Sequence, residues 1–243
     1  MSKSSACAAL DLDALPALEL VADRKRFSCV LWDCDGTLLD TIADLAAAAN
    51  HVCEAHGWPT FTEEEYKLKV GNGQRVLVTR FMPAELAADE KLVEDTYREF
   101  CAYYGEHKED RTAPYPGVVE ALEEIAAAGV RMGVLTNKNQ AESEALVQRY
   151  FGDLLTVVQG RTDDMPAKPE PPMTRALMRR LKAGPASTLM VGDTKVDIAC
   201  GTNVGIATCG VLWGFRGQAE LEAAGADWIV ERPQQVVDLV LGR

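Results

Sequence analysis

The second half of the chain alternates short apolar runs with segments of helical periodicity. Strand-like runs occupy residues 131–136, 155–159, 188–191, 205–209 and 227–230, and helical patterns cover 117–128, 140–150, 173–182 and 194–202. An apolar run at 28–33 supplies one earlier strand. Strands that alternate with helices form a parallel sheet covered on both faces. We therefore predict an α/β fold with a doubly wound, Rossmann-like core, in which ligands bind at the carboxyl ends of the strands.

The segment between the first strand and this alternating region has no strand signal. Helical patterns cover 42–56, 74–81 and 90–104, another helix opens after Thr62, and glycines break the segment near 57 and 71. We predict an all-helical cap at 41–111, inserted after the first strand into a core of residues 27–40 and 112–243. Residues 1–26 form an N-terminal extension, in which a short helix at 10–22 is expected.

Charge and cysteine content exclude several classes of partner. The chain of 243 residues has a net charge of −12, which repels nucleic acid and anionic membranes. It has neither an apolar stretch of about 20 residues nor the pattern of a signal peptide. Seven cysteines without metal-binding spacing indicate reduced thiols. We expect a cytoplasmic monomer or homodimer with no nucleic-acid or membrane partner.

The first strand delivers two carboxylates into a turn. Asp33 and Asp35 are two residues apart, so their side chains leave an extended segment on the same side. One can act as a nucleophile and the other as a proton donor and acceptor at a single reacting centre. Gly36 permits a tight turn whose N–H groups, including that of Thr37, can approach an anion. The alternative interpretation is an ordinary turn at the end of a strand.

Two further motifs follow strands and suit an anion. Thr136 and Asn137 end the second strand just before a helix, where a hydroxyl and N–H groups can surround an anion. The alternative is simple capping of that helix by Asn137 or Asn139. Lys168 lies in a loop stiffened by four prolines, which indicates a lysine held against an anion rather than a solvated one.

A second pair of carboxylates follows the apolar run at 188–191. Asp193 and Asp197 are four residues apart, so both face the same way around the start of a helix. Like charges this close are unfavourable unless a cation bridges them, and Mg²⁺ prefers carboxylate and phosphate oxygens. A phosphorylated substrate also needs local positive charge in such an acidic chain. Mg²⁺ is therefore the expected cofactor.

These four motifs, in this order, resemble the haloacid dehalogenase superfamily of phosphohydrolases over about residues 27–232. The family's motifs are matched by the run 33–38, by Thr136, by Lys168, and by Gly192, Asp193 and Asp197. Within the superfamily the chain is similar to the phosphoglycolate phosphatases in the cap loop 71–77 and in the run 136–138. It departs from their pattern at Gly201, which leaves the end of the helix after Asp197 undefined.

The resemblance implies an enzyme that hydrolyses a small phosphate ester through an aspartyl phosphate. Asp33 would be the nucleophile, and Asp35 would act first as acid and then as base. Lys168 and Thr136 would hold the phosphoryl oxygens, together with N–H groups of Gly36, Thr37 and Asn137.

The resemblance also assigns the metal and the specificity residues. Mg²⁺ would be held by Asp33, the backbone carbonyl of Asp35 and Asp193, while Asp197 would orient Lys168 or a metal-bound water. In the cap loop, Gly73 and Arg75 would contact the organic part of the substrate, with Arg75 paired to a carboxylate such as that of glycolate. The alternative for Arg75 is a solvated arginine on a helix.

Two other interpretations stay open at this point. The same motifs and cap type occur in phosphatases and phosphomutases of other small phosphate esters, such as sugar phosphates. A phospho-accepting signalling domain also combines Asp, Thr, Lys and Mg²⁺ on a doubly wound sheet. There, however, the acceptor lies on a middle strand of a smaller domain, and Asp35 is poised here to activate water.

Overall fold

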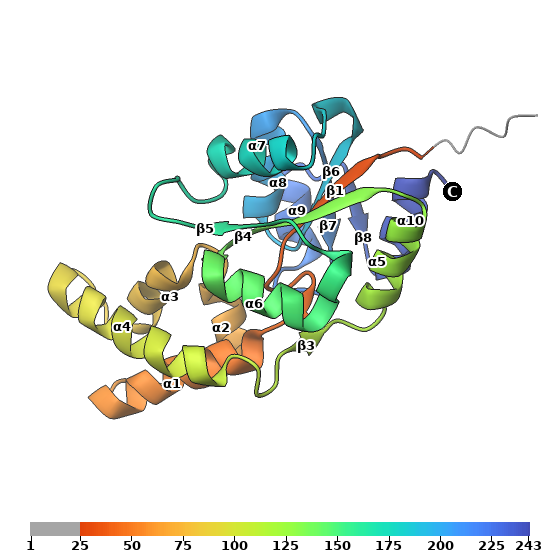
Figure 1. Ribbon diagram of the computed structural model, residues 1–243. Helices are drawn as coiled ribbons and strands as arrows, with labels where there is room; N and C mark the ends of the chain where they lie inside the picture. Colours follow the sequence, from red (N-terminus) through yellow and green to blue (C-terminus); the bar gives the residue numbers. More distant parts are fainter. Residues whose placement is uncertain (1–24) are drawn as a thin grey trace, which may run out of the picture.

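A computed structural model describes residues 25–243, so the helix expected at 10–22 lies outside the described residues. The core is a sheet of parallel strands in the order β5-β4-β1-β6-β7-β8 (Figure 1). The strands are β1 (Cys29–Trp32), β4 (Arg131–Asn139), β5 (Val158–Arg161), β6 (Thr188–Gly192), β7 (Ala207–Val211) and β8 (Trp228–Val230). The predicted doubly wound parallel sheet is confirmed.

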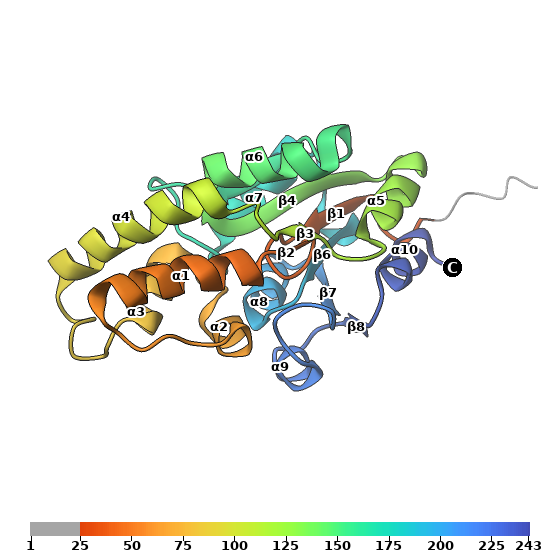
Figure 2. The ribbon, with the colours of Figure 1, turned by 90° about the horizontal axis from the view of Figure 1, so that it is seen from below.

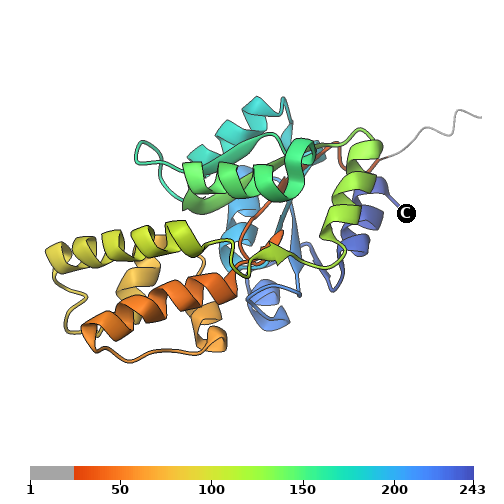
Figure 3. The same cartoon turned by 60° about the horizontal axis from the view of Figure 1, so that its bottom comes forward.

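Helices cover both faces of this sheet (Figures 1 and 3). One face carries α5 (Val118–Ala127), α6 (Gln140–Phe151) and α10 (Pro233–Leu241), and the other carries α7 (Pro171–Arg180) and α8 (Lys195–Val204), beside which lies α9 (Gln218–Ala223). Side chains of β1 alternate between the two layers: Val30 and Trp32 join the first, and Cys29 and Leu31 the second. Because both faces are buried, the strand is apolar throughout.

The strand order places β1 at the point where the chain changes direction across the sheet. The chain builds β4 and β5 on one side of β1 and then crosses to β6 on the other side. Trp32 is in register with Val134 of β4 and Val191 of β6. The carboxyl ends of these three strands therefore meet, which is where doubly wound sheets bind ligands.

The segment 41–111, which we call the cap, consists of four helices beside this edge of the sheet (Figure 2). They are α1 (Ile42–His56), α2 (Glu63–Lys69), α3 (Gln74–Phe81) and α4 (Glu90–His107). The cap has an apolar cluster of its own, with Tyr66, Phe81 and Phe100 fully buried. Its two connections to the core pair as short antiparallel strands, β2 (Leu39–Asp40) and β3 (Ala113–Pro114), which are too short to show a periodicity in the sequence.

Asp44 fixes the return connection from the cap. Its buried carboxylate accepts hydrogen bonds from the backbone N–H of Arg111 at 3.0 Å and from the N–H and hydroxyl of Thr112, both at 2.8 Å. The first turn of α1 is thereby tied to the start of β3.

None of the helices within residues 25–243 is long and apolar enough to cross a membrane.

We expect Asp44→Ala to lower the free energy of unfolding by about 3 kcal/mol, because it leaves several buried donors without an acceptor. Urea denaturation followed by circular dichroism measures this loss. The matched control is Asp110→Ala, which removes only an exposed contact with His107 and should change stability by less than about 1 kcal/mol. Equal losses for the two variants would contradict the role of Asp44.

The structure corrects one local expectation and settles another. Strand β4 continues through Asn139 instead of ending at 136, so Thr136 lies within the strand, while α6 begins at Gln140 as predicted. The helix after Asp197 continues through Gly201 to Val204. Gly201 lies where α8 crosses β7, and a Cβ there would come within 2.2 Å of the Thr208 methyl. The glycine thus allows close packing and does not end the helix.

Candidate active site

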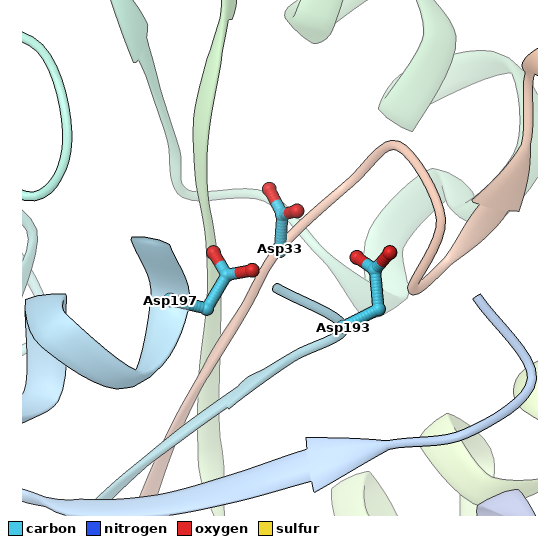
Figure 4. A group of neighbouring side chains, drawn as sticks. All are labelled: Asp33, Asp193 and Asp197. Carbon is cyan, nitrogen blue, oxygen red and sulfur yellow. The ribbon is translucent and has the colours of Figure 1, made fainter. Parts of the chain in front are cut away.

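Three buried carboxylates meet at the carboxyl ends of β1 and β6. Asp33 follows β1, Asp193 follows β6, and Asp197 lies in the first turn of α8 (Figure 4). One oxygen from each lies within 4.8 Å of the other two. Taking several like charges out of water is costly unless cations compensate them. The arrangement therefore requires positive charge at this point.

Lys168 supplies part of that charge. Its ammonium donates to Asp33 and to Asp197, both at 2.7 Å, and to the carbonyl oxygen of Leu135 at 2.9 Å. Burial favours the neutral amine, yet the carboxylates of Asp197 and Asp33 raise the pKa of Lys168 above its ordinary value. Lys168 is therefore a charged lysine whose three donors are all used, in contact with the predicted nucleophile.

Asp197 has the contacts that a positioning role requires. One of its oxygens accepts from Lys168, and the other accepts from the backbone N–H and hydroxyl of Thr194 at 3.1 and 2.8 Å. These bonds form a capping box at the start of α8. Both oxygens of Asp197 are thus engaged by protein groups, while Lys168 is held in place.

Asp193 is fixed by two loops. The hydroxyl of Thr37 donates to one of its oxygens at 3.1 Å, and the backbone N–H of Phe215 donates to the other at 2.8 Å. Burial and the neighbouring Asp197 raise the pKa of Asp193 to about 7. Gly36 makes this approach feasible, because its φ is 88° and a Cβ there would lie 2.5 Å from an Asp193 oxygen.

The donor set fits a hard divalent cation. Burial and Asp197 raise the pKa of Asp33, as expected where carboxylates outnumber their cations. Asp197 is paired with the charged Lys168 and caps α8. Asp193 accepts only from uncharged donors, and one oxygen of Asp33 accepts no hydrogen bond from the described residues. Asp33 and Asp193 are therefore the carboxylates better placed to hold an ion. Oxygen donors of this kind are what Mg²⁺ prefers. The predicted third ligand, the backbone carbonyl of Asp35, stays a prediction.

Asp35 contacts a lysine that received no role from the sequence. Lys138 donates to the two oxygens of Asp35 at 3.0 and 3.3 Å and to the hydroxyl of Tyr104 in α4 at 2.9 Å. The sequence contains a signal for this role in its spacing. Lys138 lies two residues after Thr136, so in β4 both side chains point to the same side, and both line the same cavity. It was missed because β4 was expected to end before Lys138.

Asn137 braces the loop that carries Lys168. Its side-chain oxygen accepts from the backbone N–H of Lys168 at 2.8 Å, and its amide donates to the carbonyl oxygens of Lys168 at 3.2 Å and Gly71 at 3.3 Å. Capping of α6 is done by Asn139, which accepts from Ala141 at 3.0 Å. Binding of an anion by the Asn137 backbone stays a prediction.

These groups surround a cavity of about 30 Å³ between the core and the cap. Its lining includes six residues predicted for the site: Asp33, Asp35, Gly73, Thr136, Asn137 and Lys168. The structure does not bring Arg75 to them. Arg75 contacts Glu90 at 2.9 Å and Glu94 at 3.6 Å, and lines an outer cleft of about 640 Å³. This cleft adjoins the inner cavity, because Gln74 and Asn137 line both.

The loop 212–217 after β7 also reaches the site, and sequence reasoning missed it. Trp213 donates from its indole to the carbonyl oxygen of Thr37 at 2.9 Å, and the side chain of Phe215 packs into the apolar cluster of the cap. Arg216 donates to the carbonyl oxygens of Lys67 and of Val70, the latter at 2.8 Å. The place of this loop in the sequence could have indicated its role, because it directly follows a parallel strand and therefore lies at the edge of the sheet where ligands bind.

Arg216 is expected to hold the cap against the core, because it satisfies carbonyl groups at the end of α2. We expect Arg216→Ala to lower kcat/KM by about tenfold through the loss of charged hydrogen bonds of about 1.5–3 kcal/mol. Steady-state kinetics and hydrogen exchange in residues 67–77 measure the effect. Arg98→Ala, which removes an exposed pair with Glu94, is the control. Unchanged exchange and kinetics in the Arg216 variant would refute this role.

Comparison with known proteins shows similarity over most of the chain. A model of the haloacid dehalogenase-like hydrolase family matches residues 30–211. A phosphoglycolate phosphatase from Vibrio parahaemolyticus is 32% identical over 222 residues, which cover 89% of this chain and 97% of the relative. An N-acetylmuramic acid 6-phosphate phosphatase from Pseudomonas aeruginosa is 33% identical over 219 residues, which cover 89% and 96%. A solved structure of a provisionally assigned phosphoglycolate phosphatase from Lactobacillus delbrueckii subsp. bulgaricus has a TM-score of 0.84 at 28% identity, covering 90% of this chain and 100% of that chain.

Proposed function

Because the chain belongs to the haloacid dehalogenase-like hydrolase family and is a phosphoric monoester hydrolase, we propose that it hydrolyses 2-phosphoglycolate to glycolate and phosphate. The observation that carries this proposal is the contact of 2.7 Å between Asp33 and the buried Lys168, in a cavity that also contains Asp35. A carboxylate held beside a fixed cation, with a second carboxylate nearby, suits nucleophilic attack on an anion.

The first half of the reaction transfers the phosphoryl group to the enzyme. A carboxylate oxygen of Asp33 attacks phosphorus in line, and the bond between phosphorus and the ester oxygen breaks. Asp35 gives its proton to the departing alkoxide, which leaves as the alcohol. The products of this half are an aspartyl phosphate at Asp33 and free glycolate.

The second half restores the enzyme. Asp35, now a carboxylate, takes a proton from water as the water attacks phosphorus, and the bond between phosphorus and Asp33 breaks. Thr136 and Lys168 hold the phosphoryl oxygens in both halves, together with the N–H groups of Gly36, Thr37 and Asn137. Lys168 does so by sharing with the phosphoryl group the donor that contacts Asp33 in the free enzyme. Asp33 and Asp193 would hold Mg²⁺, whose charge offsets the repulsion between a carboxylate and a phosphate dianion.

The inner cavity supports a small substrate. Its volume of about 30 Å³ has room for about two water molecules, so binding of any ester requires the cap to move, and a small alcohol requires the least movement. A panel of phosphate esters, assayed with Mg²⁺ for released phosphate, tests the assignment through kcat/KM. We expect 2-phosphoglycolate to rank first, and a clear preference for a sugar phosphate would refute it.

A sugar-phosphate phosphatase is the second candidate. The outer cleft of about 640 Å³ is large enough for a sugar and adjoins the inner cavity, with which it shares Gln74 and Asn137. The Pseudomonas aeruginosa relative, at 33% identity, is named for a phosphorylated amino sugar. A phosphomutase would produce an isomer and no free phosphate, so the same panel separates these possibilities. The hydrolase family excludes the signalling-domain interpretation.

We place this reaction in the cytoplasm, carried out by a monomer or homodimer whose partner is a small phosphorylated metabolite. The net charge of −12 supports a protein that binds neither nucleic acid nor anionic membrane. Six cysteines among the described residues are free thiols, which is typical of a reducing compartment.

A further inference from the structure

We propose that Lys138 binds an anionic group on the alcohol part of the substrate, and so selects phosphate esters whose alcohol carries a carboxylate. This inference rests on the proposed function, because it concerns the same cavity. Two cations line that cavity among the residues the structure describes, Lys138 and Lys168. Their positions relative to Asp33 and Asp35 assign them to opposite ends of the substrate.

Lys168 belongs to the phosphoryl end. It contacts Asp33, which attacks phosphorus, and its other two donors are used by Asp197 and the carbonyl of Leu135. Lys138 belongs to the alcohol end, because it contacts Asp35 at 3.0 Å, and Asp35 delivers the proton to the ester oxygen. In 2-phosphoglycolate the carboxylate carbon is only two bonds from that oxygen. Its carboxylate is therefore carried toward Lys138.

Lys138 has a donor available for this carboxylate. An ammonium has three N–H donors, and the two oxygens of Asp35 can share one of them while Tyr104 takes a second. The third can point to the cavity that Lys138 lines. The side chain of Lys138 is 1% exposed, so a hydrogen bond from it to an anion gains strength from the surrounding low dielectric.

The cap holds Lys138 in a fixed position. Tyr104 is fully buried in α4 and stacks on Phe100 with ring centres 5.6 Å apart, so its hydroxyl is a rigid partner for the ammonium. A substrate carboxylate near Asp35 would otherwise meet a like charge once Asp35 has given up its proton. Arg75, the cation that the sequence suggested for this purpose, is engaged by Glu90 and Glu94 outside the inner cavity. Lys138 therefore replaces it as the specificity-determining cation.

The test compares 2-phosphoglycolate with the phosphate ester of glycolamide, which has nearly the same shape but an uncharged alcohol part. We expect the wild-type enzyme to prefer the carboxylate by about 100-fold in kcat/KM, as a charged hydrogen bond allows. Lys138→Met should reduce this preference to near unity, and Lys138→Arg should retain most of it. If Lys138→Met lowers kcat/KM equally for both substrates, the loss reports only the positioning of Asp35. The ratio of the two kcat/KM values is therefore the decisive quantity.

Two controls separate binding from folding. Lys91→Met changes an exposed lysine on the same helix as Tyr104 and should leave both kcat/KM values unchanged. Tyr104→Phe removes the hydroxyl but keeps the charge of Lys138, and should retain the preference. Circular dichroism and the melting temperature check each fold, and Lys138→Gln serves as a second neutral variant if Lys138→Met unfolds.

Each outcome bears on a different statement. A Lys138→Met or Lys138→Gln enzyme that keeps the wild-type preference would overturn the inference and leave the phosphatase assignment intact. A wild-type enzyme that hydrolyses both esters equally well would overturn it without any variant. A wild-type enzyme that hydrolyses neither ester but cleaves a sugar phosphate would instead show that the proposed substrate is wrong.

Discussion

We expect Asp33→Asn to abolish turnover and to leave the fold intact. The amide cannot attack phosphorus, so kcat should fall by at least about 10⁴-fold, on the scale seen when a catalytic nucleophile is removed. The fold should survive because Asn has the same shape and can still accept a hydrogen bond from Lys168 through its amide oxygen. Phosphate release under saturating substrate and Mg²⁺ measures the loss, and circular dichroism checks the fold. Turnover within tenfold of wild type would exclude Asp33 as the nucleophile.

Asp35→Asn provides the contrasting variant. With p-nitrophenyl phosphate the leaving group departs without a proton, so the first half of the reaction should proceed in this variant. The second half lacks its base, so the phosphoenzyme should accumulate. It is detected as radioactive label transferred to the protein from p-nitrophenyl phosphate that carries radioactive phosphorus. Asp33→Asn should show no label under the same conditions. Label on Asp33→Asn, or none on Asp35→Asn, would reverse or refute the roles assigned to these carboxylates.

The predicted site residues that the structure brings together are all read from local patterns in the sequence. Asp33, Thr136 and Asp193 follow apolar runs, and the strand order brings the ends of β1, β4 and β6 together. Lys168 could be predicted because four prolines around it are a local signal. Local patterns, together with the rule that doubly wound sheets bind ligands at the carboxyl ends of their strands, were therefore sufficient to predict where these residues meet.

The contacts that were missed depend on how distant segments are oriented. Lys138, Asp35 and Tyr104 come from β4, the turn after β1 and α4, and nothing local to any of them indicates the other two. Arg75 was assigned to the substrate because its loop resembles a family motif, yet the direction of its side chain is set by two glutamates of α4. The packing of the cap on the core decides such contacts, and short-range periodicity carries no information about it.

Removal of divalent cations is expected to eliminate activity, because Asp33 and the substrate phosphate would then repel each other across the site. Chelation with EDTA should reduce phosphate release to background, and addition of Mg²⁺ should restore it. Asp193→Asn removes one of the two carboxylates left to hold the ion, so it should raise the Mg²⁺ concentration needed for half-maximal activity by about 100-fold.

The control for this experiment is Asp153→Asn, which changes an exposed residue that lines neither the inner cavity nor the outer cleft. Its Mg²⁺ requirement should match that of the wild type. Asp193 also accepts hydrogen bonds from Thr37 and Phe215, and an asparagine can keep only one of them as an acceptor. The melting temperature in EDTA therefore distinguishes lost structure from lost metal binding. If Asp193→Asn is folded and has the wild-type Mg²⁺ dependence, the ion is not held by Asp193. Full activity of the wild-type enzyme in EDTA would contradict the metal requirement itself.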